Sequence, residues 1–232
     1  MLSKTLIIIP AHMDSGRFPG KPLGEVLGRP LIHWVYNQAQ QVSDTCVCTP
    51  DQEIAAYCED KKIPFVLSPY GIHNGTHRCA ESLSAYDRCC DYDVVVNWQC
   101  DEPLIEPAWV EQLIAEVRDR WMIGTLVAPL GNNQWQDENI VKVSVSNDHC
   151  MWFSRGHLRG AMGHIGVYVY PREALLELGR LKPTELSQAE SLEQLAWLEN
   201  HYPIRAVRVD RLPLTINTPE DLEQLKQIVK DS

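Results

Sequence analysis

The stretch TLIIIPAHMDSGRFPGKPL, residues 5–23, decides how the chain begins to fold. Its apolar, β-branched first part predicts a strand that ends at Pro10. The loop that follows is rich in small residues and carries two cations, Arg17 and Lys21. A loop of this kind between a strand and a helix usually binds an anion through backbone N–H groups and nearby cations. Asp14 is unusual there, because a plain phosphate loop favours glycine and disfavours negative charge.

The composition is that of a globular protein with an acidic charge balance. The 232 residues are 44% hydrophobic and 22% charged, and the formal net charge is −10. This charge argues against broad binding to nucleic acid, because few basic residues are available to neutralise phosphates. The apolar run between Lys4 and Pro10 is too short for the core of a signal peptide or for a membrane span. We therefore expect a cytoplasmic protein with neither nucleic acid nor membrane as a partner.

Cysteine and histidine spacing follows no common metal or disulfide pattern. The eight cysteines include no C-x-x-C pair, and the eight histidines form no H-E-x-x-H pattern. Free thiols in a reducing compartment are the favoured interpretation, and a structural zinc site is disfavoured. The cysteines are Cys46, Cys48, Cys58, Cys79, Cys89, Cys90, Cys100 and Cys150.

Apolar runs alternate with helical patterns through the first half of the chain. This alternation predicts an α/β fold whose strands pair in parallel through right-handed crossovers. We expect strands at 5–10, 46–49, 64–67, 92–98 and 122–129, and helices at 30–42, 52–61, 76–88 and 106–119.

The pattern changes after Asn133. Strand-like stretches then follow one another without long helices between them, which predicts a mixed or antiparallel insertion. The last helix opens at Thr218, where a threonine cap, a proline and an acidic first turn agree. We expect strands at 140–145, 151–155, 163–170 and 204–209, and helices at 172–179, at 190–200 and after 218.

Two carboxylates, Asp101 and Glu102, follow directly after the strand that ends at Trp98. Ligands of open parallel sheets bind at the carboxyl ends of the strands, so these carboxylates and the loop after Pro10 should face one cleft. Cations on one loop and carboxylates on the other suggest a site for Mg²⁺ and phosphate, because Mg²⁺ takes one or two carboxylates, several waters and substrate phosphates. The alternative is that the carboxylates only cap the next helix.

Seven short motifs are spread over nearly the whole chain, each weak alone but specific together. They are Arg17-x-Pro19-Gly20-Lys21-Pro22-Leu23, Gly75-Thr76-x-Arg78, Gln99-x-Asp101-Glu102-Pro103, Phe153-Ser154-Arg155, His164-Ile165-Gly166-Val167-Tyr168, Glu190-Ser191-Leu192-Glu193-Gln194-Leu195 and Thr218-Pro219-Glu220-Asp221-Leu222-Glu223. In content and order they resemble the CMP-Kdo synthetases, the 3-deoxy-manno-octulosonate cytidylyltransferase family.

This resemblance implies a Rossmann-like nucleotidyltransferase fold, with a mostly parallel central sheet flanked by helices and a mixed or antiparallel insertion in the second half. It implies one domain, with a nucleotide-binding half at 1–130, an acceptor-binding and dimerisation half at 131–217 and a C-terminal helix at 218–232. Enzymes of this family transfer CMP from CTP to a small acidic sugar and release pyrophosphate. The family likeness also favours a homodimer.

The same resemblance assigns roles to residues of the first half. Lys21 and Arg17 would neutralise triphosphate oxygens, and Asp101 would hold Mg²⁺, so these three are the expected catalytic residues. Asn217 is the second expected metal ligand. The expected nucleotide-binding residues are Pro10, Ala11, Asp14, Ser15, Arg17, Lys21, Asn74, Gly75, Arg78 and Gln99.

The later motifs would bind the acceptor. Arg155 suits an acidic sugar, because a guanidinium pairs with a carboxylate through two hydrogen bonds. The other residues supply donors and acceptors for hydroxyl groups, although outside the resemblance they read equally as sheet residues or a solvated helix face. The expected acceptor residues are Arg155, His164, Tyr168, Glu190 and Gln194.

Several departures from the family pattern lie at these ligand positions. In the first loop His12 replaces an arginine and Asp14 a glycine. Asn217 stands where the family carries a metal-binding aspartate, and the segment 156–162 is shorter than its counterpart. Either a second metal compensates for the added carboxylate of Asp14, or Asp14 replaces the lost metal ligand, contacts the acceptor or points away. Gly16, His77 and Cys100 also replace a serine, an acidic residue and a glycine.

Three functions remain open at this point. The leading one is transfer of CMP to a 2-keto-3-deoxy sugar acid similar to Kdo. The loop changes and the short 156–162 segment also suit a cytidylyltransferase with a smaller phosphonate or phosphate acceptor. Asn217 and the lost loop arginine also suit a nucleotide-binding descendant without turnover. The sequence alone does not name the acceptor.

Overall fold

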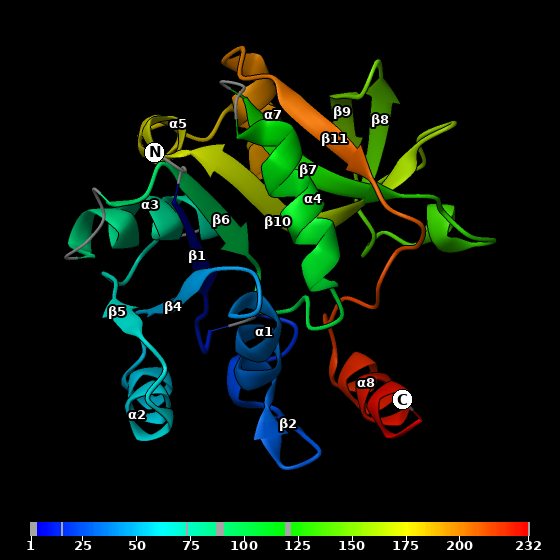
Figure 1. Cartoon of the computed structure of the whole chain (residues 1–232). Coiled ribbons are helices and arrows are strands. Elements are labelled where there is room, and N and C mark those ends of the chain that lie inside the picture. The colour runs from blue at the N-terminus through cyan, green and yellow to red at the C-terminus, as the bar shows by residue number, and fades with distance from the viewer. Residues whose placement is uncertain (1–3, 15, 73, 87–90, 119–121, 232) are drawn as a thin grey trace.

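A computed structural model describes residues 4–14, 16–72, 74–86, 91–118 and 122–231 (Figure 1). The strands are β1 (Thr5–Pro10), β2 (Glu25–Val26), β3 (Arg29–Pro30), β4 (Asp44–Thr49), β5 (Phe65–Leu67), β6 (Val94–Trp98), β7 (Ile123–Ala128), β8 (Lys142–Ser146), β9 (His149–Ser154), β10 (Met162–Pro171) and β11 (Ile204–Arg208). The helices are α1 (Leu31–Ala39), α2 (Gln52–Lys61), α3 (Gly75–Ala85), α4 (Pro107–Val117), α5 (Arg172–Leu178), α6 (Glu185–Glu190), α7 (Glu193–Glu199) and α8 (Pro219–Lys230), with 3₁₀ turns η1 (Lys21–Leu23) and η3 (Gln134–Gln136).

In the described part of the chain, one nine-stranded sheet runs through both halves in the order β5-β4-β1-β6-β10-β7-β11-β9-β8. Parallel ladders join β5, β4, β1 and β6, and a further one joins β7 to β11. Strand β10 runs antiparallel between β6 and β7, and β8 and β9 form an antiparallel pair. The sheet is therefore mixed and not mostly parallel as expected: β5, β4, β1 and β6 form a parallel block, whereas β7 pairs in parallel with β11 and antiparallel with β10.

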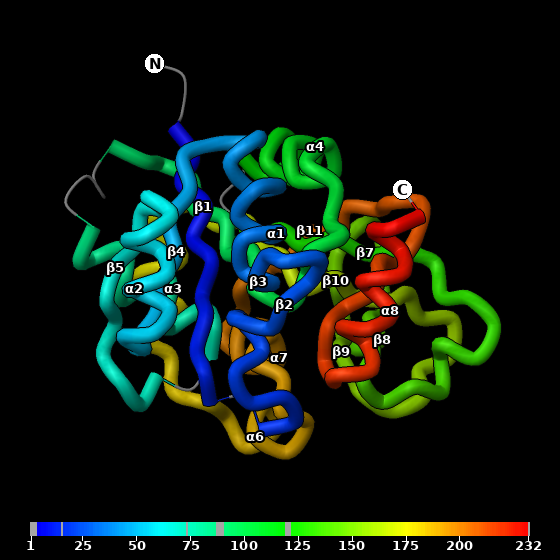
Figure 2. The backbone as a smooth tube through the Cα atoms, turned by 90° about the horizontal axis from the view of Figure 1, so that it is seen from below, coloured from blue at the N-terminus to red at the C-terminus, as the bar shows by residue number. Residues whose placement is uncertain are grey.

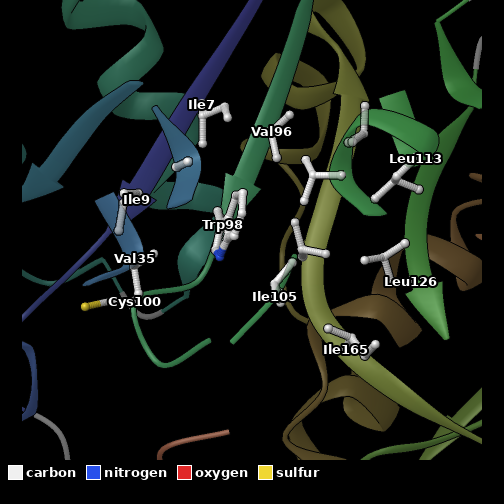
Figure 3. Packing of buried hydrophobic residues seen from close by; sticks show 14 of the residues in the cluster. Ile7, Ile9, Val35, Val96, Trp98, Cys100, Ile105, Leu113, Leu126 and Ile165 are labelled. Atoms are coloured by element: carbon white, nitrogen blue, oxygen red, sulfur yellow. The ribbon is translucent and has the colours of Figure 1, made fainter. Parts of the chain in front are cut away.

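Side-chain alternation on β1 divides the core into two layers. Ile7 and Ile9 face the layer under α1, α2 and α4, whereas Leu6 and Ile8 face the layer under α3, α5 and α7. Successive side chains of a strand point to opposite faces, so a continuous apolar run indicates a strand covered on both sides. Figure 3 shows the first of these layers, in which residues of α1 and α4 pack on the sheet.

The C-terminal helix α8 covers a separate small cluster. Leu222 and Leu225 pack with Val26, Leu31 and Ile216, beside the hairpin of β2 and β3. The two views in Figures 1 and 2 place α8 beside β2, across the molecule from α2 and β5. The end of the chain is thereby brought back to the loop that follows β1.

The expected elements are present, with two differences. The helix expected at 190–200 is the shorter α7, which begins at Glu193, and it is preceded by α6, a helix that was not expected and that ends where Ser191 takes a left-handed conformation (φ 54°). The hairpin of β2 and β3 was not expected, since its strands are only two residues long. Parts of two expected helices, residues 87–88 and 119, lie outside the described residues. In the described regions, every helix is too short or too polar to cross a membrane.

The six cysteines in the described part carry free thiols and are buried. Burial raises the pKa of the Cys100 thiol to about 12 and that of Cys58 to about 11. These thiols are thus protonated and chemically quiet at neutral pH. Cys89 and Cys90 lie outside the described residues.

Gly124 on β7 is a point where the helix layer touches the sheet closely. A Cβ atom there would lie 2.3 Å from Cγ2 of Val117 and 2.9 Å from Cδ1 of Leu113 on α4. We expect Gly124→Ala to destabilise the fold by about 1–3 kcal/mol through overpacking. Urea unfolding measures the effect. Gly16→Ala is the control, because a Cβ at Gly16 meets no atom within 4 Å; equal midpoints for the two variants would contradict the expectation.

Candidate functional site

The carboxyl ends of β1 and β6 open onto two adjoining cavities. The register Val167↔Trp98 brings the first part of β10 beside the end of β6. A large cavity of about 870 Å³ and a small cavity of about 100 Å³ meet at this edge of the sheet. The residues that line both cavities are Asn74, Gly75, Gln99 and Asp101.

The small cavity collects most of the predicted nucleotide-binding residues. Arg17 lies instead on the wall of the large cavity. Asp14 is exposed and lines neither cavity, and Ser15 lies outside the described residues. The predicted residues on the small cavity's wall are Pro10, Ala11, Lys21, Asn74, Gly75, Arg78 and Gln99.

The amino terminus of α3 shapes the wall shared by the two cavities. The Asn74 side chain caps the helix by accepting a hydrogen bond from the backbone N–H of His77 at 2.8 Å. Gly75 allows Gln99 to lie against the helix, since a Cβ there would be 2.4 Å from the Gln99 Nε2. Buried Arg78 donates to the Ser68 hydroxyl and to the Ile72 carbonyl, both at 2.8 Å. Gly75 and Arg78 of the motif Gly75-Thr76-x-Arg78 therefore both have structural roles at the start of α3.

An ion pair between Lys21 and Asp101 connects the first loop to the end of β6. The Lys21 Nζ lies 2.7 Å from Oδ2 of Asp101, and it also donates to the Ile216 carbonyl at 3.0 Å. The two side chains are 12% and 27% exposed, so this pair is screened less than a surface pair. Through its Nζ atom, Lys21 therefore connects the loop after β1 to the end of β6 and to the segment before α8.

Arg17 spans the mouth of the large cavity. Its guanidinium donates to Oδ1 of Asn139 and, at 2.8 Å, to Oδ1 of Asn217. The three residues come from the first loop, from the turn before β8 and from the segment before α8. Sequence reasoning missed Asn139, which lies 122 positions from Arg17 and carries no local signal.

The predicted acceptor residues gather on the large cavity, with one exception. Arg155, His164, Tyr168 and Gln194 line it. Glu190 does not, and its carboxylate accepts hydrogen bonds from the Ser154 hydroxyl at 3.3 Å and the Arg155 backbone N–H at 3.4 Å. Glu190 thus lies behind Arg155, and its expected contact with an acceptor stays a prediction.

His164 is neutral at physiological pH. Burial and the charge of Arg155 lower its pKa to about 3. The Thr125 hydroxyl donates to the Val167 carbonyl at 2.8 Å, so it accepts a hydrogen bond from Nε2–H of His164 at 3.0 Å. The hydrogen-bond network therefore assigns the proton to Nε2 and leaves Nδ1 as an acceptor.

Three buried side-chain oxygens on the large cavity have no hydrogen-bond partner in the described part of the protein. They belong to Glu102, Glu193 and Gln194. Burial and then neighbouring Asp101 raise the pKa of Glu102 to about 8. Burial raises the pKa of Glu193 to about 7, although hydrogen bonds with Thr76 oppose the shift. Both glutamates belong to motifs seen in the sequence, but their burial was not visible there.

Two residues that differ from the family pattern, His77 and Cys100, lie at the two cavities or beside them. The ring nitrogens of His77 lie 2.7 Å from the Asn74 side-chain oxygen and 2.9 Å from the Leu181 carbonyl. Cys100 is buried on the wall of the small cavity. His77 therefore connects the start of α3 to Leu181, while Cys100 shares the wall of the small cavity with Lys21.

The possible metal ligands in the described chain are few. Asp101 and Asn217 both line the large cavity, but no group of three or more His, Cys, Asp or Glu side chains gathers there or elsewhere in the described ranges. Such a donor set does not form an all-protein cage. It fits Mg²⁺, which is commonly held by one or two protein oxygens together with substrate phosphates.

Comparison with known proteins gives consistent similarities. A model of the cytidylyltransferase family matches residues 6–205. The 3-deoxy-manno-octulosonate cytidylyltransferase of Myxococcus xanthus is 36% identical, covering 98% of this chain and 97% of that protein. The mitochondrial enzyme of the same name from Arabidopsis thaliana is 33% identical, covering 99% of this chain and 84% of that protein.

A solved structure also matches over the whole chain. It is described as CMP:2-keto-3-deoxy-manno-octonic acid synthetase complexed with CTP, and it is 30% identical with a TM-score of 0.90, covering 99% of each chain. A glucose-1-phosphate thymidylyltransferase structure, described as putative, from Bacillus anthracis has a TM-score of 0.72 at 14% identity, which shows a shared fold alone.

The raised pKa of Glu193 predicts a pH-dependent stability. The folded chain keeps this proton up to about pH 7, whereas an unfolded glutamate loses it near pH 4.5, so stability falls as pH rises through this window. With rising pH the free energy of unfolding should therefore decrease less steeply in Glu193→Gln than in the wild type, by at most about 1.4 kcal/mol per pH unit. Unfolding at pH 5 to 8 measures it, with Glu185→Gln on exposed α6 as the control. An unchanged slope in Glu193→Gln would contradict the assignment.

Proposed function

The chain belongs to the cytidylyltransferase family, and from this membership we propose that it transfers CMP from CTP to an acidic sugar of the 2-keto-3-deoxy type and releases pyrophosphate. The relatives and the solved structure that it matches over nearly full length carry names for this activity. The small cavity would hold part of the nucleotide and the large cavity the acceptor.

The composition of the large cavity supports an acceptor that is both acidic and rich in hydroxyl groups. Arg155 offers a guanidinium for a carboxylate. The unpartnered oxygens of Glu102, Glu193 and Gln194 are costly to bury and gain partners when a ligand supplies hydroxyl groups. Nδ1 of His164 adds a further acceptor.

The same composition argues against the smaller acceptors. A phosphate or phosphonate brings anionic oxygens, which accept hydrogen bonds and supply no donor to the unpartnered side-chain oxygen of Gln194. Lys21 and Asp101 retain the charged pair that phosphoryl transfer needs, which argues for turnover over simple nucleotide binding.

The reaction joins the anomeric hydroxyl oxygen of the sugar to the α-phosphorus of CTP. The hydroxyl loses its proton, the bond from the α-phosphorus to the bridging oxygen breaks, and pyrophosphate leaves with the bonding electrons. Negative charge grows on the phosphoryl oxygens and on the leaving group, so positioning and charge neutralisation dominate catalysis. Lys21 and Arg17 supply fixed positive charge, while Gln99 and Gly75 shape the wall between nucleotide and acceptor.

We propose that Mg²⁺ assists this reaction, held by Asp101 and Asn217 together with the triphosphate. The ion would neutralise phosphate oxygens as the charge grows. In the described structure Asn217 accepts from Arg17 and Asp101 pairs with Lys21, so both oxygens already lie among cations. A further carboxylate from Asp14 would strengthen the site.

We also propose a homodimer formed through the second half, in the cytoplasm. Met151 and Trp152 on β9 are 57% and 39% exposed, and large exposed apolar side chains on neighbouring positions are typical of protein interfaces. Sedimentation of the purified chain measures the oligomeric state.

Removal of the Lys21 charge should cost activity severely. We expect Lys21→Ala to reduce turnover about 100- to 1000-fold, the range for loss of one preorganised charge-stabilising group. Pyrophosphate release with CTP and a 2-keto-3-deoxy sugar acid measures it, with Lys61→Ala on exposed α2 as the control. A folded Lys21→Ala variant with near-normal turnover would refute the role of the loop.

The two metal-ligand candidates can be separated by magnesium titration at saturating CTP. We expect Asn217→Asp to lower the Mg²⁺ concentration for half-maximal activity, because a hard dication prefers charged oxygen. If Asp14 serves as a ligand, Asp14→Asn raises the requirement severalfold and the double variant recovers most of the loss. An unchanged magnesium dependence in Asp14→Asn would remove Asp14 from the metal site.

A further inference from the structure

Lys142 is a lysine with no exposed surface. It lies at the start of β8, where the backbone pairs with Ser154 on β9 and with Gly163 on β10. Strands thus flank it on both sides. Neither cavity is lined by Lys142.

The ammonium of Lys142 binds two backbone carbonyls. Nζ donates to the Asp137 carbonyl and, at 2.8 Å, to the Arg155 carbonyl. Asp137 and Arg155 both line the large cavity, yet they come from different segments, the turn before β8 and the end of β9. One buried nitrogen therefore ties two walls of the large cavity together.

A second contact strengthens this connection. The Arg155 guanidinium donates to the Glu138 carbonyl at 3.3 Å. Asn139, the next residue of the same turn, accepts from Arg17 of the first loop. The turn 137–139 consequently lies between Arg155 on the acceptor side and Arg17 on the nucleotide side, and Lys142 holds this turn from within.

The charge of Lys142 needs an explanation beyond packing. A methionine would fill nearly the same volume without the cost of removing an ammonium from water. Burial lowers the pKa of Lys142, and the charges of Asp137 and Glu138 oppose this shift. Unlike an apolar side chain, the ammonium donates hydrogen bonds to the backbone carbonyls of Asp137 and Arg155.

We propose that Lys142 is a positioning residue for acceptor binding, which fixes Arg155 and the turn 137–139 at the distance needed to receive an acidic sugar. The inference rests on the proposed function of the large cavity. Lys142 itself does not touch the acceptor and acts through Arg155. Arg155, which Lys142 contacts, and Arg17, which contacts the turn at Asn139, would thereby keep a fixed relation across the cleft.

The test compares variants by steady-state kinetics of pyrophosphate release, with CTP and a 2-keto-3-deoxy sugar acid varied separately. Lys142→Met removes the hydrogen bonds and keeps the length, and Lys142→Arg keeps a charged donor. We expect Lys142→Met to raise the KM of the acceptor at least tenfold and to change the KM of CTP less than twofold. Lys142→Arg should recover part of the loss. Lys61→Met on α2 is the matched control.

A double-variant cycle with Arg155→Lys tests whether Lys142 acts through Arg155. If it does, the combined effect on the acceptor KM is clearly smaller than the product of the single effects. Multiplicative effects would mean that Lys142 does not act through Arg155. Equal increases of both KM values, or an unchanged acceptor KM, would overturn the proposal.

Folding is followed by circular dichroism and by the melting shift that CTP produces. If Lys142→Met does not fold, the comparison of Lys142→Arg with the wild type decides, and a selective increase of the acceptor KM is expected there as well. Failure of both variants to fold would overturn the proposal, because the ammonium would then serve the fold itself. Absence of pyrophosphate release by the wild type would instead refute the proposed function.

Discussion

The reversed direction of β10 is the constraint on which the site depends. Parallel strands β1 and β6 end at the same edge of the sheet, and ligands of such sheets bind beyond those ends. Because β10 runs antiparallel beside β6, its first residues rather than its last lie at this edge. His164 and Tyr168 are therefore delivered to the mouth opened by the first half of the chain. A parallel strand in that place would carry them to the far edge.

The first loop and the segment before α8 are held together at the same edge. Lys21 binds Asp101 and the Ile216 carbonyl, and Arg17 binds the Asn217 side chain. Residues 216 and 217 come directly before α8, whose leucines pack under the β2 and β3 hairpin. The cations of the first loop thus have defined partners in the ligand-free chain, and under the proposed function little reorganisation would be needed when charge develops.

Local patterns predicted the elements well, and the parts that they missed depend on contacts distant in sequence. The continuous apolar run at 5–10 and the capping residues at Thr218 are local signals, and both elements are present as expected. The break between α6 and α7 depends on the left-handed conformation of Ser191. The sequence did not predict this break, because serine has no strong preference for that conformation. Asn139 could not be recognised from the sequence, because its partner Arg17 is distant along the chain. The carboxyl of Glu193 could not be recognised either, because its burial results from the fold. Seven of the predicted nucleotide-binding residues line one small cavity, and their motifs also shape the backbone there, as Gly75 does against Gln99.

The departures from the family pattern are electrostatically linked. Replacement of the loop arginine by His12 and the gain of Asp14 both reduce positive charge near the proposed triphosphate. Burial and the charge of Arg78 lower the pKa of His12, so the imidazole does not restore that charge. Asn217 acts in the opposite direction. Arg17 lies against its neutral amide, whereas an aspartate there would neutralise the guanidinium. A neutral residue at 217 therefore leaves the charge of Arg17 unpaired by a carboxylate at this contact, and under the proposed function this charge would offset part of what the loop has lost.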